Sequence, residues 1–212
     1  MAEGEELEEV RSRLDASGWN PHGECYPSTI CRAWMMMALI RDEILELSLG
    51  PPVEAHSTEA RRDNLKRRSE MTYAEMPSQL KYKPGDINYR TASQFTLVIA
   101  LHQEYLLNSF LLDRLPTSGS LKSRQDLIDT ARKMLDGILV LCANRDKLTN
   151  QNFFVWSISY SGIPSVAILS VELLKESKFP NDSRLALPRS EVIQNLSMFI
   201  GSLEWVRPSE GE

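Results

Sequence analysis

The chain has 212 residues, a formal net charge of −5 and 42% hydrophobic residues. This length and apolar content predict a folded protein with one sizeable core. The acidic balance argues against direct binding to nucleic acid, because duplex affinity depends on clustered Lys and Arg that neutralise phosphates.

The first segment of the chain is acidic. Residues 3–17 are rich in Glu and carry Leu7, Val10 and Leu14 at helical spacing, which predicts a short amphipathic helix. A secretory signal would be basic here, so none is expected. Residues 19–27 are rich in Gly, Pro and Asn and predict a loop. We therefore divide the chain into residues 1–28, an acidic helix and loop, and residues 29–212, one helical domain.

Two helices are predicted next, over residues 29–49 and 58–75. Residues 35–40 are apolar on every side, so the first helix is expected deep in the core, and Gly50 followed by two prolines ends it. The second helix holds the densest basic stretch, which is interspersed with acids and predicts a solvated face of mixed charge: Arg61, Arg62, Lys66, Arg67 and Arg68.

Further along, residues 77–89 predict an extended or irregular segment, and helices are expected over 91–115 and 121–143. Residues 153–171 are uncharged and long enough to span a membrane. Several serines interrupt this run, and Gly162 and Pro164 lie in its middle. These features favour a buried central helix over residues 153–175, bent at 162–164 because proline cannot donate to the preceding turn.

The last helix is predicted to start near Pro188 and to end before Pro208. Its apolar residues recur every three or four positions and predict one docked face: Val192, Ile193, Leu196, Phe199, Ile200 and Leu203. Sustained alternation of apolar and polar residues is absent from the sequence. The predicted fold class is all-α, with six to seven helices in a bundle-like or irregular domain.

The cysteines do not predict a metal site. Cys25 and Cys31 lie near His22, but they lack the paired spacing of zinc ligands, and Cys142 falls on an apolar helical stripe as a buried thiol. Three cysteines without this spacing also indicate a reducing compartment and no disulfide framework.

Catalytic candidates are equally few. Asp42 and Glu46, with Glu43 between them, resemble the carboxylate-rich helices of all-α terpene synthases, but a second acidic cluster is missing, so an exposed charged strip is expected. His102 sits on an apolar face and predicts a hydrogen-bonded core histidine. Trp34, Trp156 and Trp205 are expected to anchor the core. The residues therefore predict no catalytic, cofactor-binding or metal-ligating site, and no enzyme.

The sequences of several segments nevertheless resemble one family, the fungal-specific transcription factor domain. This domain is the regulatory middle region of fungal binuclear zinc-cluster transcription factors. The strongest similarity is in residues 187–212, which read LPRSEVIQNLSMFIGSLEWVRPSEGE. Weaker similarities recur in order along the chain: Trp34, residues 40–51, 76–82, 101–112, 144–146 and 154–164.

The resemblance implies that residues 29–212 are the C-terminal part of such a regulatory domain, acting in the nucleus on RNA polymerase II transcription. The family's zinc cluster and coiled coil have no counterpart here, which fits a fragment, a truncated gene model or a regulator without its DNA reader. The family implies DNA contact and zinc only through an N-terminal module absent from this chain. It also implies a small-molecule effector or coregulator, a homodimer in the full-length protein, and no membrane. The alternative is an all-α small-molecule-binding protein or terpene-synthase-like enzyme without a recognisable site.

Overall fold

The structure is a computed structural model that describes residues 14–16, 18–20, 27–51, 55–85, 92–115, 121–148, 151–178 and 185–204. Across these ranges every regular element is helical, so the predicted all-α class is confirmed. The main elements are α2 (Pro27–Leu49), α3 (Ala55–Glu75), α4 (Ala92–Asp113), α5 (Leu121–Ala143), α6 (Gln151–Ser157), α7 (Ile163–Lys178) and α8 (Arg189–Leu203).

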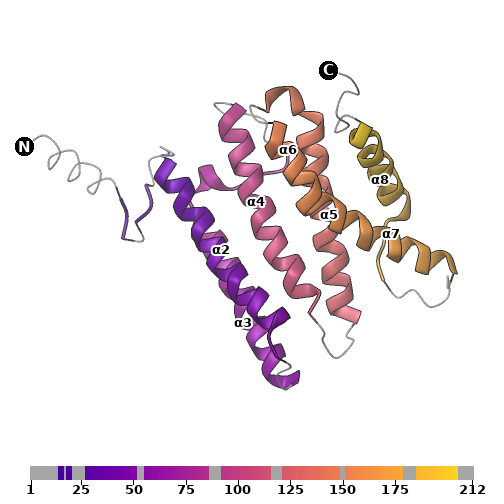
Figure 1. Cartoon of the computed structure of the whole chain (residues 1–212), viewed down its shortest axis with the longest axis horizontal. Coiled ribbons are helices and arrows are strands. Elements are labelled where there is room, and N and C mark those ends of the chain that lie inside the picture. Colours follow the sequence, from indigo (N-terminus) through magenta and orange to yellow (C-terminus); the bar gives the residue numbers. More distant parts are fainter. Residues whose placement is uncertain are drawn as a thin grey trace, which may run out of the picture.

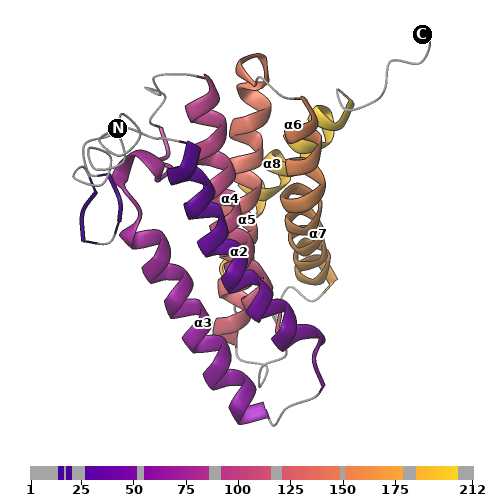
Figure 2. The same ribbon diagram turned by 60° about the vertical axis from the view of Figure 1, so that its left-hand side comes forward.

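Helices α4 and α5 form the centre of the domain (Figures 1 and 2). α2 and α3 pack against α4 on one side, and α7 and α8 cover α5 on the other. The main core cluster is built from apolar residues of α4 and α5, closed by Leu169 of α7 and by Val192 and Phe199 of α8. Burial of this surface is the dominant favourable contribution to folding.

The expectation that α2 lies deep in the core is wrong. One face is buried through Ala33, Met37, Ile40 and Ile44, at the spacing of a single helical stripe. On the outer side, Met35 and Leu39 are each 64% exposed. A helix with apolar residues on every face can be buried on all sides. α2, however, packs chiefly on α3 and α4, which cover only part of its surface.

The helix expected over residues 153–175 consists of α6, a π-helical turn (Ile158–Gly162) and α7. The π turn ends two residues before Pro164. Proline has no N–H to donate to the carbonyl of Tyr160, so the regular α-helical hydrogen bonding is interrupted at this point. The bend expected at residues 162–164 stays a prediction.

This run was also expected to be central, and that expectation is wrong. Two of the described helical stretches, Gln94–Asp113 and Asn152–Lys178, are long and apolar enough to cross a membrane by length and composition. The most apolar window of the first is 72% buried inside the fold, against 39% for the second. α4 is therefore the buried helix, and α6 and α7 lie at the periphery with Val155, Ile163 and Leu174 exposed.

The C-terminal helix docks, as predicted, but through a narrower stripe. Val192 and Phe199 are buried, and Leu196 and Leu203 are half-buried and pack against the same core. Ile193 and Ile200, which were assigned to this stripe, are instead exposed. Pro188 caps the helix rather than lying in its first turn, and the predicted stop at Pro208 lies outside the described residues.

The expectation that Trp34 and Trp156 anchor the core is wrong. Trp34 and Trp156 are 37% and 46% exposed rather than buried, and Trp205 lies outside the described residues. Trp19, which is predicted to lie in a loop, is only 2% exposed. The Arg32 guanidinium packs over its ring, with Arg32 Cζ 4.3 Å from the ring centroid. Of the helix predicted over residues 3–17, residues 14–16 are not helical and the rest lies outside the described residues.

Candidate functional site

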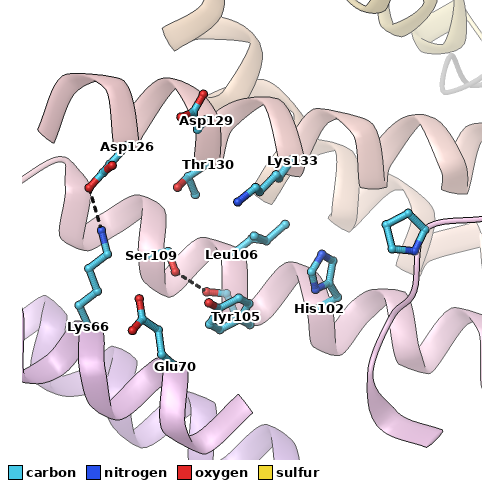
Figure 3. A pocket seen from close by; sticks show the side chains of 11 residues that line it. Lys66, Glu70, His102, Tyr105, Leu106, Ser109, Asp126, Asp129, Thr130 and Lys133 are labelled. Atoms are coloured by element: carbon cyan, nitrogen blue, oxygen red, sulfur yellow. Dashed lines mark hydrogen bonds and ion pairs between the residues drawn. The ribbon is translucent and has the colours of Figure 1, made fainter. Parts of the chain in front are cut away.

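A cavity of about 430 Å³ opens between α3, α4 and α5 (Figure 3). Most of the residues that line it are polar or charged, which distinguishes it from the apolar core beside it. The lining residues are Lys66, Glu70, Pro84, His102, Tyr105, Leu106, Ser109, Asp126, Asp129, Thr130 and Lys133. This volume falls within the range of about 300–1,000 Å³ that is usual for small-molecule sites.

Aromatic rings surround His102 at one end of the cavity. The Tyr73 hydroxyl lies 3.0 Å from Nδ1 of His102, and the Tyr82 amide donates to the same hydroxyl at 3.3 Å. Tyr73 stacks on Tyr105 with ring centroids 4.4 Å apart. The predicted hydrogen bond of His102 is confirmed, but the ring lines a cavity instead of lying within the core.

The His102 imidazole is held neutral. Burial, with a smaller contribution from the nearby Lys133 ammonium, lowers the pKa of His102 to about 4. At neutral pH the ring therefore offers the cavity a hydrogen-bonding group without charge.

The other end of the cavity contains a cluster of charged side chains that already pair with one another. The ammonium of Lys66 donates to Asp113 at 3.0 Å and to Asp126 at 3.2 Å, and the Thr130 hydroxyl donates to Asp113 at 3.2 Å. Burial alone would lower the pKa of Lys66, but the hydrogen bonds and charges of Asp113 and Asp126 raise it above its ordinary value. Lys66 thus stays protonated and ties α3 to α4 and α5.

The carboxylates singled out on α2 do not line this cavity. Glu43 accepts two hydrogen bonds from Arg68 at 2.7 and 2.8 Å, Glu46 lies 3.9 Å from Arg61, and Asp42 is exposed. The hydrogen bonds from Arg68, together with attraction to Arg68 and Arg61, outweigh the opposing effect of desolvation and lower the pKa of Glu43 below its usual value. The expected exposed charged strip is therefore paired with the basic face of α3.

The basic stretch of α3 is likewise a face of mixed charge, as predicted. Arg61, Lys66 and Arg68 pair with acids of other helices, and Arg62 lies 2.9 Å from Asp63 on its own helix. The helix therefore uses these cations to pack against its neighbours.

Of the cysteines, Cys31 is exposed and Cys142 is half-buried against the core, where burial raises the pKa of the thiol. His22 and Cys25 lie outside the described residues. In the part of the chain that the structure describes, no three His, Cys, Asp or Glu side chains are grouped as metal ligands.

Sequence reasoning missed this cavity because its walls come from three helices. A signal was present: Asp126, Asp129, Thr130 and Lys133 recur at three- and four-residue spacing along α5, forming a polar stripe beside the apolar one. The spacing alone could not show that α3 and α4 leave a space opposite that stripe.

Comparisons with protein-family models, with curated proteins and with solved structures gave no significant match to this chain.

Proposed function

We propose that this chain is the regulatory part of a fungal zinc-cluster transcription factor, acting in the nucleus on RNA polymerase II transcription. In this proposal a separate zinc-cluster module contacts DNA and holds the zinc. The domain described here holds the activator silent or responds to a small effector or a coregulator.

The observation that carries the proposal is that the segments resembling this family contact one another in space. Arg41 of α2 bonds to the Glu104 carboxylate of α4 and to the Tyr160 hydroxyl of the π turn. Its Nε also donates to Asn108 at 3.0 Å. Three segments separated along the chain thus meet at the guanidinium of Arg41, whose side chain is only 15% exposed.

A second contact between such segments borders the cavity. Tyr82, from residues 76–82, has its ring centroid 5.1 Å from that of His102 in residues 101–112. The cavity gives the proposed effector a place to bind, and its position between α3, α4 and α5 would let a ligand alter how these helices pack. The same cavity favours the second candidate, an all-α small-molecule-binding protein without a role in transcription.

The test places the full chain between a heterologous DNA-binding domain and an activation domain in a fungal host. We expect reporter transcription below that of a fusion with an unrelated helical domain of equal length, while promoter occupancy stays equal. Phe199→Ala, which removes a buried side chain, should raise transcription, and Ile200→Ala on the exposed face should not. Equal transcription from all four fusions would contradict the regulatory role and leave the second candidate.

A further inference from the structure

The imidazole of His102 opens into the cavity through one of its two nitrogens. Nδ1 is engaged by the Tyr73 hydroxyl at 3.0 Å, whereas Nε2 has no hydrogen-bond partner in the part of the chain that the structure describes. Nε2 also retains accessible surface, so it is not sealed inside the core. Because the ring lines the cavity, Nε2 is the polar atom that His102 presents there (Figure 3).

A chain of hydrogen bonds decides which nitrogen carries the proton. The backbone N–H of Tyr82 donates to the hydroxyl oxygen of Tyr73 at 3.3 Å, and in this chain the hydroxyl donates its own proton to Nδ1 of His102. A neutral imidazole has a single N–H, so an Nδ1 that accepts leaves the proton on Nε2. His102 thus offers the cavity a hydrogen-bond donor without a charge.

Aromatic and apolar surface surrounds this donor. The ring centroid of His102 lies 5.1 Å from that of Tyr82, 5.7 Å from that of Tyr73 and 6.3 Å from that of Tyr105. Tyr105 and Leu106 line the cavity beside His102 on α4. A flat apolar ring gains most from such a wall, through burial and through contact with aromatic faces.

The charged side chains of the wall do not select a charged ligand. Lys66 is already paired with Asp113 and Asp126. Glu70 and Lys133 are exposed and of opposite sign, so water hydrates and screens them. A ligand with a full charge would therefore lose hydration at the imidazole without gaining a buried partner of opposite charge.

We propose that this cavity binds an uncharged aromatic carbonyl compound. Its oxygen accepts the hydrogen bond from Nε2 of His102, and its ring packs against Tyr105 and Leu106. The carbonyl gives the imidazole N–H the acceptor that it lacks within the described residues, and the ring buries apolar surface. The inference deepens the proposed function, on which it rests only for treating the ligand as the effector.

The experiment uses the whole chain and three probes of matched shape: acetophenone, α-methylstyrene, in which a methylene group replaces the carbonyl oxygen, and benzoate, which is charged. Backbone amide shifts give the affinities. We expect acetophenone to shift resonances of residues 102, 105 and 106. It should bind about tenfold more tightly than α-methylstyrene, which cannot accept the hydrogen bond, and than benzoate, whose charge loses hydration.

Side-chain nitrogen spectra of the free chain test the donor directly. At neutral pH we expect His102 to show a protonated Nε2 and an unprotonated Nδ1. Tyr73→Phe removes the hydroxyl that holds Nδ1, so the two neutral tautomers should mix. The affinity of this variant for acetophenone should fall toward that for α-methylstyrene.

A pair of matched variants locates the contact. His102→Phe keeps an aromatic ring and removes the donor, so acetophenone and α-methylstyrene should bind it equally. His56→Phe makes the same change at the start of α3, well before Lys66, and should keep the tenfold difference. Circular dichroism checks that each variant is folded, and the three probes on the unaltered chain decide the question if His102→Phe is not.

Three results would overturn the inference: no shift at the cavity with acetophenone, α-methylstyrene or benzoate binding as tightly as acetophenone, or a proton on Nδ1 of His102. The reporter test is run without added ligand, so the two claims fail separately. Regulation without carbonyl-selective binding overturns the ligand class alone. Carbonyl-selective binding without regulation supports the site and removes the transcriptional role.

Discussion

The buried imidazole of His102 makes the stability of the fold depend on pH. Its pKa falls from 6.5 to about 4 on folding, so the unfolded chain binds a proton that the folded chain excludes between these values. The stabilisation is fully present above pH 6.5 and is lost as pH falls toward 4.

We expect this group to remove about 2 kcal/mol of unfolding free energy between pH 8 and pH 5. Denaturant melts of the wild type and of His102→Gln at the two pH values isolate the effect, because the other titrating groups are common to both. An equal pH dependence in the two proteins would contradict a neutral, buried His102.

Two glycines predict opposite responses to alanine. At Gly162 an added Cβ would lie 2.7 Å from Phe199 Cε2 and 3.0 Å from its Cζ. Phe199 is 2% exposed and has little room to move, so Gly162→Ala should cost about 1–3 kcal/mol through overpacking. At Gly201 an added Cβ meets nothing within 4 Å, so Gly201→Ala should raise stability by about 0.5–1 kcal/mol. Thermal melts that shift both variants in the same direction would show that α8 does not press on the π turn.

At the scale of an element, α8 is held by one narrow stripe. Phe199→Ala should cost about 3–5 kcal/mol, because it leaves a cavity between α8, α5 and the π turn. Ile200 is the next residue, but it is 62% exposed, so Ile200→Ala should stay within about 0.5 kcal/mol of the wild type. Urea denaturation gives both values, and similar losses would mean that α8 is rotated from the position described.

Across the whole molecule, Arg41 joins α2 and α4 to the π turn that leads into α7. Arg41→Met removes the cation and leaves Glu104, 14% exposed, without its charge partner, which should cost about 3–5 kcal/mol. The double variant Arg41→Met with Glu104→Leu should cost less than Arg41→Met alone, because no buried charge remains.

The control for this prediction is the exposed pair of Arg68 and Glu43, whose side chains are 45% and 43% exposed. Arg68→Met should change stability by about 1 kcal/mol or less, since solvent and side-chain entropy reduce the value of such pairs. A loss at Arg68 as large as at Arg41 would contradict the structural role of the Arg41 cluster.

The sequence by itself determined the helices and their order. Spacing of apolar residues predicted the helix of residues 121–143 at its observed bounds and placed the other described helices within a few residues of theirs, whereas the helix predicted over residues 3–17 is not helical at residues 14–16. Gly50 follows the end of α2, and Pro164 follows the π turn, because each residue affects the hydrogen bonding or conformation of the backbone next to it. Where a helix begins and ends depends largely on residues close in sequence, so it can be predicted without a tertiary structure.

Only the tertiary structure decided which apolar surfaces are buried and which polar residues meet. Trp34 and Leu39 have large apolar side chains that are typical of a core, but both are exposed, because α2 has neighbours on only part of its surface. Glu70 of α3, His102 of α4 and Lys133 of α5 are unremarkable singly and line one cavity together. Burial and site formation depend on how helices distant in the chain pack, and hydrophobic spacing specifies a face without specifying its partner.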